Sequence, residues 1–329
     1  MKQKIEKNNR LKIGSDNNIK TMTKVIPYFI TVVVLLTATR TTFAIDTKQM
    51  TMTTKKSGEV VIYMAGSGTV TIDWGDKTEV ETYTLSPSTW ADSITSSHTY
   101  SHTYSRTLNC RRVITIFGEG ITHLICEGNQ LTHLDVSKNT SLASLSCSNN
   151  KLTKLDLSNN AMLTNLYCYE NQLSNIDVSQ STLLTSFDCR DNKIKSLNVS
   201  NNISLKHFNC SNNKLTNLDV SNNAVLSSLL CTMNKLTELD VSNNTVLINL
   251  ICVNNRLTRL DVSKNIGLAW LYCGSNKLTT EALNDLFGTL HSNIYLGVNN
   301  IYIDDNPGTN HCDRSIATNK GWWFKSDLK

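Results

Sequence analysis

Eight cysteines recur at intervals of 21 residues, from Cys126 to Cys273. Thiols can form disulfides, ligate soft metal ions or act as nucleophiles. Neighbouring β-strands lie about 4.8 Å apart with parallel Cβ vectors, whereas a disulfide needs converging Cβ atoms about 3.8 Å apart. A metal site likewise needs ligands that converge on one point. We therefore expect free, buried thiols that act as small hydrophobes, with a paired ladder as the less favoured alternative. The series is Cys126, Cys147, Cys168, Cys189, Cys210, Cys231, Cys252 and Cys273.

Other titratable residues show no catalytic pattern. His98 and His102 are four residues apart, which suits a metal site on a helix, but their Ser, Thr and Tyr neighbours favour a strand or loop. Asp73 and Asp76 could form an acid pair, yet their surroundings favour a turn. The sequence contains no G-x-S-x-G, H-E-x-x-H or phosphate-loop motif. We predict no catalytic residue, no metal and no cofactor, and therefore no enzyme.

An asparagine follows each ladder cysteine by three residues, which extends the repeat beyond the thiols. The frame L-x-x-L-x-C-x-x-N-x-L-T-x-L-D-V-S surrounds each one, as at Leu142 to Ser158. This is the leucine-rich-repeat pattern, with Cys where Leu is usual and a short period. The asparagines are Asn129, Asn150, Asn171, Asn192, Asn213, Asn234, Asn255 and Asn276.

The spacing predicts how one coil is built. Side chains alternate along a strand, so Leu145 and Cys147 should point inward, and Ser144, Ser146 and Ser148 outward. Stacked coils should then form a parallel sheet on the concave face, with extended segments and turns on the outer side. The asparagine amides should bond the backbone of the turn and of the next coil.

One coil departs from the pattern, with Ser181 in place of Asn and Asn198 in place of Asp. We interpret these two outer positions as surface caps.

The repeats resemble those of secreted bacterial leucine-rich-repeat proteins of the internalin J type, over residues 121 to about 279. The resemblance implies a leucine-rich-repeat solenoid with a cysteine ladder. It also implies adhesion to a host surface or mucin. It does not identify the ligand.

The flanks of the solenoid differ in composition. Residues 45–118 alternate like strands, and we predict a two-strand hairpin from Val60–Tyr63 and Thr69–Trp74 around Gly66-Ser67-Gly68. Ile72-Asp73-Trp74-Gly75-Asp76 and His98-Thr99-Tyr100 resemble the marks of polycystic-kidney-disease-type (PKD) domains, which implies an immunoglobulin-like β-sandwich. Residues 280–329 predict an α/β cap: a helix over 280–290, a strand at 301–303, and a short helix over 313–319. Trp322 and Trp323 should close the core.

The N-terminus determines the net charge. The chain has 32 basic and 27 acidic residues, and residues 1–44 contain eight of the basic and two of the acidic ones. This segment, basic and then apolar over 25–36, predicts a signal peptide, with Met22 as a possible true start. The remaining chain has a net charge of about −1, and its basic residues are scattered. Both properties disfavour nucleic-acid binding. We expect no membrane span in the mature chain and a secreted, extracellular protein, or alternatively a periplasmic or surface-associated one.

These features predict four parts: signal peptide 1–44, PKD-like domain 45–118, solenoid 119–279 with about eight coils, and cap 280–329. We predict a non-catalytic binding protein that presents the solenoid strand face to a protein or glycan. The alternatives are a secreted enzyme or enzyme-associated module with its activity in the N-terminal domain, and a structural envelope protein. An apolar, aromatic cluster at the C-terminal end of the face is the expected anchor. The candidate ligand-binding residues are Tyr167, Tyr169, Asp188, Arg190, Leu230, Ile251, Val253, Trp270 and Tyr272.

Overall fold

A computed structural model describes residues 49–87, 99–104, 110–292 and 299–325. They belong to one compact unit. The predicted signal peptide and His98 lie outside the described residues. Neither of the two helices in the described ranges is long and apolar enough to cross a bilayer.

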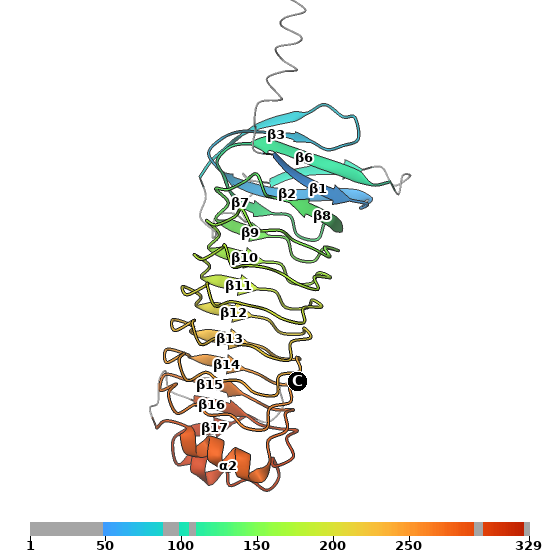
Figure 1. Ribbon diagram of the computed structural model, residues 1–329. Coiled ribbons are helices and arrows are strands. Elements are labelled where there is room, and N and C mark those ends of the chain that lie inside the picture. Colours follow the sequence, from blue (N-terminus) through green and yellow to red (C-terminus); the bar gives the residue numbers. More distant parts are fainter. Residues whose placement is uncertain (1–48, 88–98, 105–109, 293–298, 326–329) are drawn as a thin grey trace, which may run out of the picture. The chain divides into compact units, whose positions relative to one another are not determined.

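Three-residue strands stacked in parallel form the repeat region (Figure 1). Each strand pairs with the next at an offset of one repeat, so that Leu145 lies beside Leu166 and Phe187 beside Phe208. Equivalent residues of successive coils therefore form straight columns. The strands are β9 (Ser144–Ser146), β10 (Asn165–Tyr167), β11 (Ser186–Asp188), β12 (His207–Asn209), β13 (Ser228–Leu230), β14 (Asn249–Ile251) and β15 (Trp270–Tyr272).

The turn after each strand requires an unusual backbone conformation. From Asn150 onward, the residue before each ladder asparagine has a φ between 50° and 56°, as at Glu170, Asp191 and Met233. Non-glycine residues adopt this left-handed region at an energetic cost. The asparagine that follows compensates by bonding the turn backbone, as described below for Asn192. The strained turn and the asparagine thus recur together.

The eight strands of the N-terminal part are divided between two sheets. β2, β5 and β7 belong to the same twelve-stranded sheet as the solenoid strands, while β1, β3, β4, β6 and β8 form a five-stranded sheet. The resemblance to a PKD-type sandwich stays a prediction. The strands are β1 (Gln49–Thr54), β2 (Gly58–Gly66), β3 (Gly68–Asp73), β4 (Glu81–Leu85), β5 (Thr99–Tyr104), β6 (Arg112–Gly118), β7 (Ile121–Ile125) and β8 (Leu131–Asp135).

The predicted hairpin around Gly66-Ser67-Gly68 is wrong. Both strands exist, but β2 pairs with β5 and β7, whereas β3 pairs with β4 and β6. Gly66 has a φ of 151°, and a Cβ there would lie 2.0 Å from the Gly120 carbonyl oxygen. The turn therefore leads the chain from one sheet to the other, and it packs closely against the turn at residues 118–121.

Hydrogen bonds cross the predicted boundary between residues 118 and 119. β1 pairs with β8, and β2 pairs with β7, both within the first coil. Asn129, the first ladder asparagine, donates to the Val61 carbonyl at 2.6 Å and accepts from the Val61 N–H at 3.1 Å. The N-terminal strands thus cover the open end of the solenoid and supply the hydrogen bonds that a preceding coil would otherwise supply.

Two helices and two strands follow the last full coil. α2 (Thr280–Thr289) begins behind Thr279, whose hydroxyl accepts from the Ala282 N–H. β16 (Asn299–Tyr302) and β17 (Trp322–Phe324) extend the sheet, with α3 (Ser315–Thr318) between them. Trp322 is buried, but Trp323 is 67% exposed, so the expectation that both tryptophans close the core is wrong for Trp323. Successive strand residues face opposite sides, so only one of the two can point inward.

Candidate functional site

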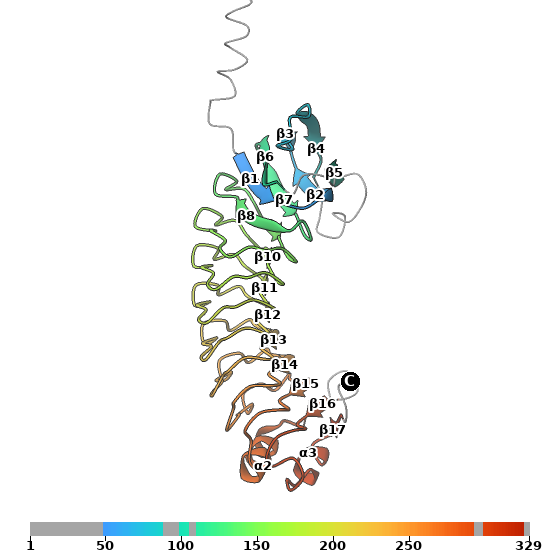
Figure 2. The same cartoon turned by 90° about the vertical axis from the view of Figure 1, so that its right-hand side faces the viewer.

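The strand face of the solenoid is the surface on which the sequence places its variable residues. It lies on the concave side of the stack in Figure 2. Three columns of side chains point away from the interior. In each coil they come from the first and third residues of the strand and from the second residue after the strand, as at Asn165, Tyr167 and Tyr169. The in-register pairing places Tyr167 beside Asp188 and Asn209 beside Leu230. Side chains distant in sequence therefore form one continuous surface.

The N-terminal end of this face is covered. Ser144, Ser146 and Ser148 are 1%, 0% and 0% exposed, so the expectation of an exposed serine row here is wrong. The hydroxyl of Ser146 donates to the Glu127 carboxylate, across from the preceding coil. Small serines lie low between longer neighbours, which close over them. The coil of Ser144 thus adds no accessible side chain to the face, although Glu127 of the preceding coil is exposed.

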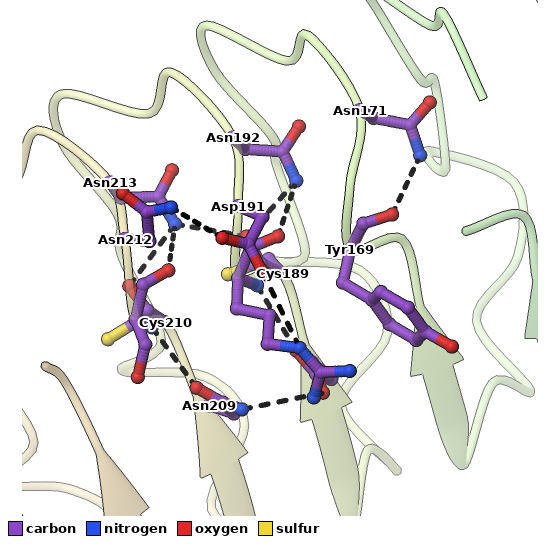
Figure 3. A network of polar contacts seen from close by, with 12 residues as sticks. Tyr169, Asn171, Cys189, Asp191, Asn192, Asn209, Cys210, Asn212 and Asn213 are labelled. Carbon is purple, nitrogen blue, oxygen red and sulfur yellow. Dashed lines mark hydrogen bonds and ion pairs between the residues drawn. The ribbon is translucent and has the colours of Figure 1, made fainter. Parts of the chain in front are cut away.

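A polar network occupies the centre of the face (Figure 3). The Arg190 guanidinium donates to the Asp188 carboxylate at 2.5 Å and lies 4.1 Å from the centre of the Tyr169 ring. Desolvation raises the pKa of Asp188, while hydrogen bonds from the Arg190 backbone and the charge of its side chain oppose that rise. Asp188 is 14% exposed and Arg190 is 36% exposed. A ligand that reaches this cluster meets an arginine held in place by an aromatic ring and a carboxylate.

A shallow pocket of about 220 Å³ lies beside this network. Tyr167 and Leu230 form apolar walls, and Asp188, His207 and Asn209 provide polar groups. Phe187 and Phe208 stack beneath it with ring centres 5.5 Å apart. An apolar wall with a few convergent polar groups is the usual composition of a binding pocket. The remaining lining residues are Ser186 and Ser228.

The predicted aromatic anchor at the C-terminal end is only partly accessible. Trp270, Leu230, Ile251 and Val253 are half-buried. Tyr272 is 9% exposed, because its ring packs edge-on against Tyr302 of the next strand. The expectation that Tyr272 is exposed is therefore wrong.

Trp323 takes the exposed aromatic position at this end. In-register pairing places Trp270 beside Asn300, and Asn300 beside Trp323. The sequence does not reveal this position of Trp323, because residues 280–298 interrupt the 21-residue period. The strands beyond the last repeat can therefore not be counted from the spacing.

The interior columns carry no reactive chemistry. All ten cysteines are free, and the eight ladder thiols are buried. Burial raises the pKa of Cys147, Cys210 and Cys252 to about 12, so these thiols stay protonated at neutral pH. Protonated, buried thiols are neither nucleophiles nor metal ligands. The described residues also contain no group of three or more His, Cys, Asp or Glu side chains that could hold a metal ion.

The ladder asparagines each tie two coils together. The Asn192 amide donates to the carbonyls of Cys168 and Cys189, at 3.0 and 3.1 Å, and its side-chain oxygen accepts from the Leu173 N–H at 2.9 Å. Figure 3 shows bonds of this kind within single coils, from Asn171 to the Tyr169 carbonyl and from Asn213 to the Cys210 carbonyl. The bonds to the preceding coil recur from Asn171 to Cys147 and from Asn213 to Cys189. One side chain thus bonds the turn of its own coil and the backbone of the preceding one.

A second asparagine column lies on the outer side, and here the interpretation as surface caps fails in part. Ser181, Asn202 and Asn223 are fully buried. Asn202 donates to the carbonyls of Val178 and Ser181 in the preceding coil. Asn198, in the aspartate column, is an exposed cap as expected, and its side chain accepts from the Ser200 N–H. The period alone does not distinguish these two columns.

The His102–Asp76 pair is the strongest enzyme-like contact in the N-terminal strands. His102 Nε2 lies 2.7 Å from the Asp76 carboxylate. The His102 ring stacks on Trp74 and packs edge-on against Tyr104. Asp76 also accepts from the Thr78 backbone and hydroxyl, and its pKa is lowered by these bonds and by His102 against an opposing desolvation. These contacts fix the turn after β3, which favours a structural role.

Two exposed features of the repeat are absent from the sequence expectations. The turns before the strands carry an apolar residue in each of six successive coils, from 42% to 62% exposed: Met162, Leu183, Ile203, Val225, Val246 and Ile266. The turns after the strands carry a basic column, treated below. Aligning the coils in the sequence would have found both.

The stacked coils, the leucine core and the parallel strand face define a leucine-rich-repeat β-solenoid. No protein-family model matches the sequence, and no curated protein matches it. Among solved structures, the functional domain of InlJ from Listeria monocytogenes, described as including a cysteine ladder, is 37% identical. That match has a TM-score of 0.48 and covers 60% of this chain and 47% of that one.

Two further structures are similar. The leucine-rich-repeat protein LIC12759 of Leptospira interrogans is 22% identical with a TM-score of 0.50, over 58% of this chain and 50% of that one. An internalin C2 from Listeria monocytogenes is 20% identical with a TM-score of 0.47, over 50% and 77%. The chain spans about half the length of the first two. The predicted solenoid with a cysteine ladder is confirmed.

Proposed function

We propose that this chain is a secreted, non-catalytic binding protein that presents its strand face to a protein or glycan, as an adhesin would to a host surface or mucin. The observation that carries the proposal is the contrast between columns. Interior positions repeat from coil to coil, whereas the face changes from Tyr167 through Asp188 and Asn209 to Leu230. The fold requires the first set and leaves the second set free.

The accessible chemistry of the face supports this function. Tyr167 and Tyr169 offer large contact areas at little cost in rotamer entropy, and arginine and tyrosine are enriched where binding energy concentrates. Trp270 and Trp323 provide a second aromatic region further along the stack. Trp270 lies five rungs, or roughly 24 Å, and Trp323 seven rungs, or roughly 34 Å, from the coil of Tyr167. Two anchors at this separation suit an extended partner.

Secretion is supported by the sequence of residues 1–44. A basic start, an apolar segment and small residues before the compact unit are typical of a signal peptide. The protein is then extracellular, or alternatively periplasmic or loosely attached to the cell surface.

An enzyme in the N-terminal strands is the alternative. It would use the His102–Asp76 pair, since this is where a histidine and a carboxylate meet. His102 is 15% exposed and enclosed by two aromatic rings, which leaves little room for a substrate.

The test begins with an array of glycans and host proteins probed with the full chain. The affinity of the ligand found is then measured for Tyr167→Ala, for Trp270→Ala and for the control Thr245→Ala, an exposed residue outside the strand face. We expect at least one of the first two to cost about 2 kcal/mol or more, and the control to be neutral. Wild-type affinity in both face variants would contradict the proposal.

Point variants are preferable to deletion of residues 45–118. β1 and β2 pair with strands of the first coil, so deletion would expose the buried Leu124 and Leu134. Loss of binding in such a deletion would report unfolding of the solenoid end. An His102→Gln variant that keeps binding would instead separate the N-terminal pair from the proposed function.

A further inference from the structure

The residues that follow the last five ladder asparagines form a basic column on the outer edge of the solenoid. The backbone N–H of Lys193 donates to Leu173 in the preceding coil, and the same bond recurs at Lys214, at Lys235 and in the next two coils, at 2.8 to 2.9 Å. These bonds place the residues directly above one another. The sequence expectation that basic residues are scattered is wrong for this surface. The column is Lys193, Lys214, Lys235, Arg256 and Lys277, all exposed.

The positive charges of this column are not neutralised nearby. No ion pair forms at these five side chains in the part of the chain that the structure describes. The residue directly before the ladder asparagine is acidic in two of the earlier coils, at Glu170 and Asp191. In the last four coils of the column, the same position is uncharged. Its residues are Asn212, Met233, Asn254 and Ser275. The C-terminal part of the column is therefore locally electropositive.

Six aspartates of the repeat form a column of their own, while the exposed Glu238 lies three residues after Lys235. Asp219 and Asp240 follow Lys214 and Lys235 by five residues of extended chain, up to about 16 Å away. A chain that is near neutral on average thus divides its charge into separate columns.

We infer that the column from Lys193 to Lys277 binds a linear acidic polysaccharide laid along the solenoid axis. Five cations spaced about 4.8 Å apart span about 19 Å in a straight line, which matches a chain of repeated carboxylates or sulfates. A threonine column, Thr216, Thr237 and Thr258, is exposed beside it and offers hydroxyls to sugar groups. Single-stranded nucleic acid favours aromatic residues interleaved with cations, and these two columns contain none.

This site is independent of the strand face, so each can fail without the other. Binding of a heparin octasaccharide to the full chain is measured by calorimetry over a series of salt concentrations. Two triple variants are compared with the unmodified chain. The column variant combines Lys214→Gln, Lys235→Gln and Arg256→Gln, and the control variant combines Lys138→Gln, Lys154→Gln and Lys264→Gln. The second set removes the same charge from other exposed positions. The basic residues of 1–44 are present in every variant, so their contribution cancels.

For the unmodified chain, we expect heparin affinity to fall about a hundredfold between 50 and 200 mM salt, because bound counterions are released. The column variant should bind at least about tenfold more weakly, with a salt slope smaller by about two, and the control variant should change less than about threefold. Equal melting temperatures establish that all variants fold. Absence of heparin binding at 50 mM salt, equal losses in the two variants, or tighter binding of a 12-nucleotide single-stranded DNA than of heparin would overturn the assignment.

Discussion

The buried columns and the strand face are built from the same 21-residue unit, yet they follow opposite rules. Cys189 and Asn192 have equivalents in every full coil, whereas Asp188 and Arg190, next to them in sequence, do not. Packing explains the first pair, because each coil must fit the one before it and satisfy its backbone. Nothing in the stack restricts the second pair. Regularity of the buried columns therefore reports structure, and variation along the strand face marks a surface free to acquire a function.

The largest expected contrast concerns thiol reactivity. Native protein should expose Cys110, which lies on the surface, and Cys312, which is partly buried, while the eight ladder thiols stay protected. Denaturation should release all ten, because nothing but burial protects the ladder. Titration with a thiol reagent before and after denaturation without reductant measures this. Fewer than ten thiols in the denatured protein would reveal disulfides and refute the free ladder.

A smaller contrast compares one ladder asparagine with its neighbour on the face. Asn192→Ala should destabilise the fold by about 1 to 3 kcal/mol, since the Leu173 N–H and two carbonyls lose their partner. Ser186→Ala, which points outward from the same coil, should change stability by less than about 0.5 kcal/mol. Denaturant unfolding measures both. Equal shifts would mean that the interior and the face have been assigned the wrong way round.

The smallest effect tests a column that is regular but exposed. Asp219 accepts from the Ser221 N–H, and Asn198 makes the same bond to Ser200 in the preceding coil. Asp219→Asn should therefore be nearly silent at pH 7.

The acid dependence of the same variant should differ from that of the unmodified protein. Hydrogen bonds from Ser221 lower the pKa of Asp219, so its contribution is present above the unfolded pKa and lost as the pH falls through the folded pKa. The Asn variant has no such proton to gain, and its melting temperature should decline less between pH 7 and pH 3. An identical decline in both proteins would show that this carboxylate does not contribute.

The sequence by itself determined the repeat architecture, because a fixed period of leucine, cysteine and asparagine permits few ways to bury the apolar positions. It predicted the free thiols from strand spacing and the ladder bonds of residues such as Asn192 from the needs of a turn. The position of α2 also followed from its helical spacing and the preceding threonine. These features depend on contacts within one coil or between adjacent coils, and local pattern is sufficient for them.

Only the tertiary structure decided which surfaces are open. β2 and β3 look like a hairpin because the sequence shows two strands and a turn, but pairing with β5, β6 and β7 places them in different sheets. Ser146 is covered by Glu127, Tyr272 packs against Tyr302, and Trp323 remains exposed. Exposure and charge density depend on neighbours that are distant along the chain, and these neighbours are set by the fold as a whole.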